Sequence, residues 1–260
     1  MKLRVLGCSG SDLPGHRLTS FLINDAILLD AGSVTSALSL DQQMAITDIL
    51  VTHAHLDHIK DILFLADNLI EFFFDEVRAP LNIRALPEVL ESIATHLLND
   101  TIWPDFTVIP ERSPVLTYTP LTPKTPIKLG GLNVAACPVN HAKCAAGYVL
   151  WSDDGRENLA YSGDTGGNGE WCEYINSLPF ALEHLITESS FPNSMEYLAR
   201  QSRHLTPKLL RRELEKLHCR PKIYIYHMKS PFSEQIQEEL HKELAGYSYH
   251  LLREKESFDF

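Results

Sequence analysis

The sequence predicts an α/β fold, a four-layer αββα sandwich in which two mixed β-sheets pack against each other between helices. Two observations support this prediction. Short strand-like runs bounded by turn residues occur in both halves of the 260-residue chain, and segments with helical spacing follow them in each half. This order of elements favours two αβ halves stacked sheet against sheet in a single domain that spans residues 1–260.

Four strand-like runs lie in the first sixty residues. Turn residues separate them, and their sequences are LRVLGC, TSFLIN, AILLDAG and TDILVTHA. The next segment is LDHIKDILFLADNLIEFFF. Its apolar residues recur at helical spacing on one broad face, which predicts an amphipathic helix.

Residues 75–128 are predicted to form an inserted helix and loop. The stretch LPEVLESIATHLLND is expected to be a helix that begins near its proline, and the rest of the segment is rich in proline and threonine. Long irregular segments inside a compact domain often form lids or subunit contacts. The sequence therefore leaves open a homodimer through this segment.

The strand pattern returns after residue 130. The expected strands are LNVAACPVN, AAGYVLWS, NLAYSGD, HLITESS and KIYIYHM. Helices are expected at residues 168–178 and 206–218, and the charged amphipathic segment SEQIQEELHKEL is expected to end the chain as a helix.

The formal net charge of −11 argues against a broad attraction to nucleic acid or to an anionic membrane, since both carry negative charge. The first residues, MKLRVLG, predict a strand rather than a signal peptide, and no apolar run reaches the length of a transmembrane helix. Five scattered cysteines without a Cys-x-x-Cys pair are typical of reduced thiols. We therefore expect a cytoplasmic protein that binds a small molecule.

Metal-seeking side chains gather directly after the predicted strands. The string VTHAHLDHI places three histidines and an aspartate within six positions, and further candidates follow three later strands. The seven candidate ligands are His53, His55, Asp57, His58, His141, Asp164 and His227. A structural zinc takes four protein ligands and a catalytic zinc three, so seven candidates suit two divalent ions that share a carboxylate. Zinc is expected, and the same ligand types also suit manganese and iron.

The motifs HAHLDH and SGDTG, with the two later histidines, resemble the ligand motifs of the metallo-β-lactamase superfamily over nearly the whole chain. By this resemblance, one metal is bound by His53, His55 and His141, and the second by Asp57, His58 and His227, with Asp164 as the bridge. The strings ITESSFPN, RHLTPKLLRREL and YHMK narrow the resemblance to the class II cyclic-nucleotide phosphodiesterases.

Proton transfer to the leaving group is the second requirement of phosphodiester hydrolysis, and His204 is the candidate donor. Glu188 is its candidate orienting partner, and this pairing resembles the His and Glu of the phosphodiesterase and tRNase Z branches. The alternative is that His204 merely precedes a helix, which Thr206 already caps. Asp57 is counted as a catalytic candidate as well as a ligand.

Four further residues bear on the surroundings of this site. Lys229 and Arg203 are candidates for neutralising the substrate phosphate, with surface charge as the alternative. Asp61 stands three positions after the last His of the first motif, where the phosphodiesterase branch usually has Gly or Ser, so the pocket wall is expected to differ. Asp30 is expected to support the ligands from behind, and the stretch GCSGSDLPG to form a tight loop at the rim.

These observations favour a binuclear metal-dependent hydrolase of small phosphodiesters. The resemblance implies a 3',5'-cyclic nucleotide, in particular cyclic AMP, which would be opened to the 5'-nucleotide. Two rival enzymes are a tRNase Z-like RNA-processing phosphodiesterase, which the acidic charge disfavours, and a lactone or thioester hydrolase, which has less use for a proton donor. A non-catalytic metal-binding protein is disfavoured because all seven ligand positions are filled.

Overall fold

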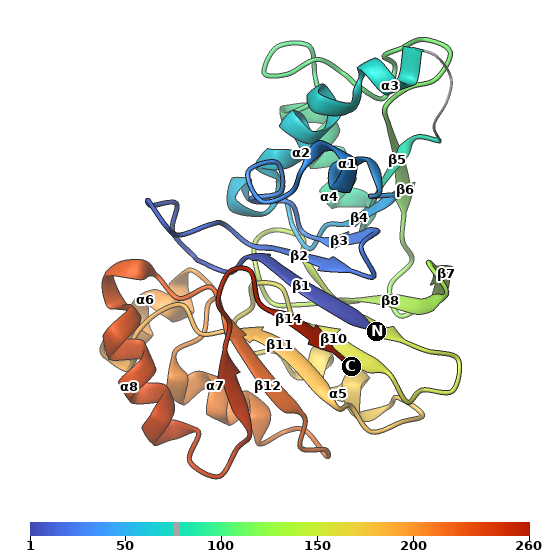
Figure 1. The fold of residues 1–260 in the computed structure, drawn as a ribbon. Coiled ribbons are helices and arrows are strands. Elements are labelled where there is room, and N and C mark those ends of the chain that lie inside the picture. Colours follow the sequence, from blue (N-terminus) through green and yellow to red (C-terminus); the bar gives the residue numbers. More distant parts are fainter. Residues whose placement is uncertain (75–78) are drawn as a thin grey trace.

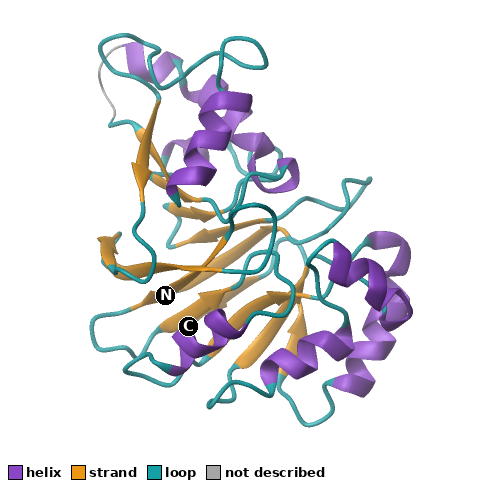
Figure 2. Cartoon of the chain, turned by 180° about the vertical axis from the view of Figure 1, so that it is seen from behind, coloured by secondary structure: helices purple, strands orange, loops and turns teal. Residues whose placement is uncertain are grey.

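The computed structural model describes residues 1–74 and 79–260. Two seven-stranded sheets pack face to face, with helices of the N-terminal half over one and helices of the C-terminal half over the other (Figures 1 and 2). The aromatic ring of Phe21 in the first sheet meets the rings of Tyr161 and Tyr226 in the second edge-on, at centroid distances of 5.4 and 5.5 Å. The predicted αββα sandwich is confirmed.

The first sheet has the strand order β14-β1-β2-β3-β4-β5-β6. Its strands are β1 (Lys2–Gly7), β2 (Ser20–Ile23), β3 (Ile27–Leu29), β4 (Asp48–Leu50), β5 (Leu81–Ala85), β6 (Leu116–Pro120) and β14 (Ser257–Asp259). The strands from β3 to β6 run parallel, whereas β1 pairs antiparallel with both of its neighbours. Its covering helices are α1 (Leu40–Met44), α2 (Leu56–Leu69), α3 (Glu71–Phe74) and α4 (Pro87–His96).

The second sheet has the order β13-β12-β11-β10-β9-β8-β7. Its strands are β7 (Ile127–Leu129), β8 (Leu132–Pro138), β9 (Ala146–Trp151), β10 (Asn158–Tyr161), β11 (His184–Glu188), β12 (Lys222–Tyr226) and β13 (Tyr249–Leu251). The helices of this half are α5 (Gly169–Asn176), α6 (Glu196–Gln201), α7 (Pro207–Leu214) and α8 (Ser233–Glu243), with short 3₁₀ turns at Asn193–Met195 and Ser230–Phe232. Strands β10 to β13 are parallel, and β7 to β10 are antiparallel.

The segment expected as an insert over residues 75–128 contributes strands as well as a helix. Its first four residues, 75–78, lie outside the described residues. From residue 79 onward the segment supplies helix α4 and a long loop, but also β5 and β6 at the edge of the first sheet and β7 at the edge of the second. In β5, buried Leu81, Ile83 and Ala85 alternate with less buried residues, which is the pattern of a strand with one face in the core.

The segment SEQIQEELHKEL forms helix α8 as predicted, but the prediction that this helix ends the chain is wrong. Strands β13 and β14 follow α8, and β14 pairs with β1 so that the two termini lie side by side (Figure 1). The amino group of Met1 donates a hydrogen bond to the carbonyl of Phe260 at 2.7 Å. The sequence of a three-residue strand has too short a pattern to be distinguished from a loop. Strands β13 and β14 form only through their pairing with the sheets that they join.

Parallel pairing places the ends of several strands at one edge of the sandwich, as is common for sites in α/β sheets. The loops after β4, β8, β10, β11 and β12 supply the residues of the candidate site. In the described ranges of the chain, no helix is both long and apolar enough to cross a membrane.

Candidate metal centre and active site

Three of the predicted ligands form the first group of metal-binding side chains. His53, His55 and His141 each offer a nitrogen, and these atoms lie within 4.8 Å of one another. His53 and His141 are buried, whereas His55, the N-cap residue of α2, is exposed. The structure therefore brings together a buried pair from two loops and one accessible imidazole.

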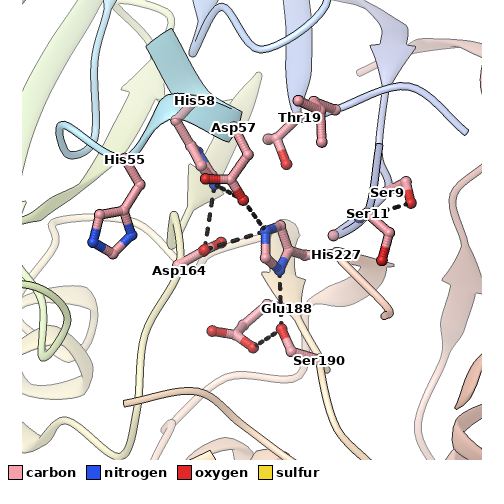
Figure 3. A network of polar contacts seen from close by, with 12 residues as sticks. Ser9, Ser11, Thr19, His55, Asp57, His58, Asp164, Glu188, Ser190 and His227 are labelled. Carbon is pink, nitrogen blue, oxygen red and sulfur yellow. Dashed lines mark hydrogen bonds and ion pairs between the residues drawn. The ribbon is translucent and has the colours of Figure 1, made fainter. Parts of the chain in front are cut away.

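The second group consists of Asp57, His58, Asp164 and His227 (Figure 3). Asp164 Oδ2 lies 3.3 Å from both His58 Nε2 and His227 Nε2, and Asp57 Oδ2 lies 3.2 Å from His227 Nε2. His58 and His227 are fully buried, and Asp164 is 1% exposed. All seven predicted ligands thus lie in two neighbouring groups at one edge of the sandwich.

The chemistry of these groups fits bound cations. Among the described residues, His53 Nε2 and His58 Nε2 are buried without a hydrogen-bond partner. The His58 nitrogen is 3.3 Å from Asp164 Oδ2, but the contact lacks hydrogen-bond geometry. An unpaired buried polar atom costs about 1–3 kcal/mol, and a divalent metal ion would satisfy both nitrogens.

Buried partners behind the ligands fix the histidine tautomers. Asp30, expected to have a supporting role, accepts hydrogen bonds from His58 Nδ1 at 2.7 Å and from the Thr52 hydroxyl at 2.8 Å. Because the single Thr52 proton is used on Asp30, its oxygen accepts from His53 Nδ1 at 3.0 Å. In the neutral form of both imidazoles, Nε2 is therefore the unprotonated nitrogen that faces the site, which is the form that a metal ion needs.

The other two buried histidines among the predicted ligands are held in the same way. His141 Nδ1 donates to the carbonyl of Arg203 at 2.9 Å, and His227 Nδ1 contacts the Ser190 hydroxyl at 3.0 Å. The Ser190 hydroxyl donates its proton to Glu188 Oε2, so that it accepts from His227. Sequence reasoning missed Ser190, because a serine after a strand has no motif that marks such a role.

The electrostatics of the second group follow from its crowding of opposite charges. Burial alone would raise the pKa of Asp164, but the neighbouring His227 and His58 hold it well below its usual range. Burial alone would lower the pKa of His58, and the Asp164 and Asp30 carboxylates raise it well above the usual value. His53, in contrast, has its pKa lowered well below the usual value by burial and then by His58. The site therefore favours ionised carboxylates, which are good metal ligands.

The predicted pair of His204 and Glu188 is present at this site. His204 Nδ1 and Glu188 Oε1 are 2.7 Å apart, and Glu188 is fully buried. Burial opposes the charged form of each, but their mutual attraction lowers the pKa of Glu188 and raises the pKa of His204. The His204 ring lies 4.8 Å from the ring of His141 and stacks on that of His227 at 5.5 Å. The pair thus adjoins both ligand groups.

Two further backbone amides complete the surroundings of Glu188. Thr165 N donates to Oε1 at 2.8 Å and Leu205 N to Oε2 at 3.2 Å. The next helix, α7, is capped by the side chain of Thr206, which accepts from Leu209 N at 3.3 Å. His204 is therefore not needed as a helix cap, and among the described residues its Nε2 forms no hydrogen bond.

Lys229 and Arg203 lie beside the site, but their cationic groups are engaged with backbone carbonyls. Lys229 Nζ donates to the carbonyl of Gly10 at 2.8 Å, and the Arg203 guanidinium donates to the carbonyl of Ala142. Arg203 adopts a φ of 55°, which brings its own carbonyl to His141. Within the described part of the chain, neither side chain forms a hydrogen bond or an ion pair with a ligand residue. Their role toward substrate remains a prediction.

Close backbone approaches explain two glycines near the ligands. A Cβ on Gly10, in the glycine-rich rim loop, would lie 2.6 Å from the carbonyl oxygen of His227. A Cβ on Gly32 would lie 2.0 Å from the carbonyl oxygen of Asp57. Both positions require glycine, because any side chain would displace a ligand-bearing loop.

Asp61 faces the loop before α1 and forms no part of a ligand group. Its Oδ2 accepts hydrogen bonds from Val34 N at 2.6 Å, from Thr35 N at 2.8 Å and from the Thr35 hydroxyl at 3.0 Å. The side chain is 5% exposed. Asp61 therefore ties helix α2 to residues 34–35, and its contacts give it a structural role rather than a place in the pocket wall.

Comparison with known proteins places these observations in a family. The family described as "Beta-lactamase superfamily domain" matches residues 26–228. The 3',5'-cyclic-nucleotide phosphodiesterase 1 of Saccharomyces cerevisiae is 38% identical over 79 residues, which cover 30% of this chain and 20% of that protein. The match thus spans about a fifth of the length of the curated relative.

Two solved structures share the whole architecture. The structure of unliganded yeast PDE1 has a TM-score of 0.84 and 19% identity, with 100% of this chain and 99% of that chain covered. The short form of human tRNase Z has a TM-score of 0.70 and 16% identity, with 100% and 99% covered. At these identities the similarity shows a shared fold.

Proposed function

This chain belongs to the beta-lactamase superfamily of metal-dependent hydrolases, and on that premise we propose that its substrate is a small phosphodiester. The observation that carries the proposal is the position of the His204–Glu188 pair beside two groups of metal ligands. A hydrolase of esters with good leaving groups has less need of a proton donor at this place. The predicted membership of the superfamily is confirmed, whereas the substrate is our proposal.

The chemistry of a phosphodiester matches the residues. Its anionic oxygens repel a nucleophile, and its leaving alkoxide is strongly basic. Two divalent cations, one for each ligand group, would screen the phosphate charge and lower the pKa of a water molecule. His204 would then donate a proton from Nε2 to the leaving oxygen, while Glu188 holds Nδ1 and stabilises the protonated imidazole.

A 3',5'-cyclic nucleotide, and cyclic AMP in particular, is the substrate that we propose within this class. The curated relative with 38% local identity bears the name of a 3',5'-cyclic-nucleotide phosphodiesterase, and the yeast PDE1 structure shares the fold over the whole chain. Hydrolysis at the 3' oxygen would yield the 5'-nucleotide. We further propose zinc as the cation and the cytoplasm as the location, which the imidazole-rich ligand set and the five free cysteines support.

An RNA-processing activity like that of tRNase Z is less compatible with this chain. The similarity to human tRNase Z shows the fold alone, and a net charge of −11 opposes the long-range attraction of a polyanion. A mononucleotide carries one phosphate and needs no extended basic surface. The acidic charge therefore supports a small substrate.

The deciding experiment is product analysis with 3',5'-cyclic AMP and protein loaded with zinc or with manganese. We expect wild type to form 5'-AMP and Asp164→Ala to lose at least about a hundredfold in rate, because the variant removes a carboxylate worth several kcal/mol to the charged centre. Asp154→Ala, in an exposed loop, is the matched control and should retain wild-type activity. Equal rates for wild type and Asp164→Ala would contradict the proposed site, and wild type that binds metal without forming 5'-AMP would contradict the proposed substrate.

A further inference from the structure

Two buried tyrosines contact the second ligand group and its support, and neither was assigned a role from the sequence. Tyr161 is the last residue of β10 and Tyr226 the last of β12, so both stand at the strand ends that carry ligand loops. Both are fully buried, and their rings lie 5.6 Å apart, held edge-on by the ring of Phe21 from the opposite sheet.

The two phenols join two carboxylates that come from different sheets. The Tyr161 hydroxyl donates to Asp30 Oδ2 at 2.6 Å, and the Tyr226 hydroxyl lies 3.3 Å from Asp164 Oδ1 and 3.4 Å from the Tyr161 oxygen. Asp30 follows the first-sheet strand β3, whereas Asp164 follows the second-sheet strand β10. The phenols therefore lie between Asp30, which supports His58 from the first sheet, and the predicted ligand Asp164 of the second sheet.

The direction of each hydrogen bond follows from the number of protons. A phenol has one proton near neutral pH, and Tyr161 uses its proton on Asp30. Tyr226 can donate to the Tyr161 oxygen or to Asp164, and an ionised carboxylate is the stronger acceptor. Tyr226 thus donates to Asp164 Oδ1 and occupies that oxygen from the interior side.

The polar contacts close into a ring that includes His58, and in this assignment the 3.4 Å contact between the two phenol oxygens carries no proton. Its Nδ1 is bonded to Asp30, the path continues through the two tyrosines to Asp164 Oδ1, and Asp164 Oδ2 returns to His58 Nε2 at 3.3 Å. Figure 3 shows Asp164 between His58 and His227, with dashed contacts to both. With Oδ1 occupied, Oδ2 is the oxygen that faces the two histidines.

We propose that Tyr226 is a positioning residue that holds Asp164 Oδ1 and so presents Oδ2 to the ligand groups before a cation binds. The proposal rests on the metal centre of the proposed function, but not on its substrate. Preorganised ligands bind a cation more tightly, because less ordering remains to be done on binding. Loss of an outer hydrogen bond to a metal ligand typically weakens metal affinity about 10- to 100-fold.

The test compares the metal affinity of Tyr226→Phe with that of wild type. Tyr226→Phe keeps the ring and removes only the hydroxyl, and Tyr224→Phe is the matched control. Tyr224 lies on the same strand, is 2% exposed, and its hydroxyl contacts His184 rather than a ligand. Zinc affinity is measured by competition with a chromophoric chelator, and coupling between two bound Mn²⁺ ions is followed by electron paramagnetic resonance.

We expect Tyr226→Phe to bind its weaker zinc ion about 10- to 100-fold less tightly and to show a changed manganese coupling, while Tyr224→Phe matches wild type. Tyr161→Phe, which opens the same ring at Asp30, should weaken the same ion. The double variant Tyr161→Phe/Tyr226→Phe should lose less zinc-binding free energy than the two single variants lose together, since both residues act on one network. Wild-type affinities and coupling in Tyr226→Phe would overturn the proposal, as would equal losses in Tyr224→Phe.

Failure of this inference can be distinguished from failure of the proposed function. Hydrolysis of cyclic AMP by wild type, with unchanged metal affinity in Tyr226→Phe, would support the function and overturn the positioning role. Two-ion binding that depends on Tyr226, without hydrolysis of any phosphodiester, would support the positioning role and contradict the function.

Discussion

At the scale of single residues, the site depends on hydrogen-bond partners that lie behind the predicted ligands and His204. Each partner determines which atom of the side chain in front of it carries the proton. Glu188 illustrates this, because its two oxygens accept from His204, Ser190 and two backbone amides. Through Ser190 the same carboxylate also reaches the ligand His227. One buried carboxylate therefore orients both the proposed proton donor and a predicted metal ligand.

Replacing Glu188 by Gln should lower kcat for cyclic AMP about 10- to 100-fold. One carboxylate oxygen becomes an NH₂ group, which cannot accept the hydrogen bonds that this oxygen accepts in wild type. The KM should change less, because Glu188 is fully buried and does not reach the substrate. Steady-state kinetics at matched metal content test this, with Glu173→Gln on the exposed side of α5 as the control. A loss of activity that only follows metal content would count against the role of Glu188 toward His204.

At the scale of elements, helix α2 carries two predicted ligands in its first turn, and hydrogen bonds one turn later attach it to the neighbouring loop. Asp57 and His58 follow the N-cap of α2, and one turn later Asp61 accepts three hydrogen bonds from residues 34–35. Asp61, which replaces the small residue of the phosphodiesterase branch, therefore affects how helix α2 is attached to this loop.

Asp61→Ser, which restores the family's residue type, should lower the free energy of unfolding by about 1–3 kcal/mol, because it leaves the amides of Val34 and Thr35 without their acceptor. The KM for cyclic AMP should stay near that of wild type. Urea denaturation and steady-state kinetics measure the two quantities, and Asp67→Ser, on the exposed face of the same helix, is the control. A large change in KM with unchanged stability would show that Asp61 belongs to the pocket.

At the scale of the whole molecule, the C-terminal strand β14 and the residues after it join the two sheets. Phe260 stacks on His184 at 4.1 Å between ring centroids, and Phe258 meets Tyr224 edge-on at 5.0 Å. His184 and Tyr224 belong to the second sheet, whereas β14 pairs with β1 in the first. The end of the chain thus contributes to the packing between sheets.

Burial lowers the pKa of His184 below its usual 6.5, so this packing should make stability depend on pH. The unfolded chain binds a proton near pH 6.5 that the folded protein takes up only at lower pH. The stabilisation is therefore complete above about pH 6.5 and is lost as the pH falls through the window between the unfolded and folded values.

His184→Phe keeps the ring stack but removes the titrating group. We expect the stability of this variant relative to wild type to rise as the pH falls from about 7.5 to 5.5, measured by urea denaturation at each pH. His96→Phe, at an exposed position on α4, serves as the control. A difference between wild type and His184→Phe that is independent of pH would contradict the prediction.

The sequence by itself determined the fold class and the set of seven candidate ligands. Apolar runs with period two and the dense HAHLDH motif are local patterns, and ligand loops after strands are expected at one sheet edge. The pairing of His204 with Glu188 was also predictable, because both lie in strings that resemble one family.

Asp30 was expected behind the ligands, but only the tertiary structure decided which other residues stand there. Tyr161, Tyr226 and Ser190 reach Asp30, Asp164 and His227 across gaps of up to 131 positions, and no local periodicity records such contacts. The short strands β13 and β14, and the strands β5 and β6 toward one edge of the first sheet, were not predicted for the same reason. Their pairing and the direction of Asp61 follow from how two sheets and their helices pack, which is a property of the assembled core and not of any single segment.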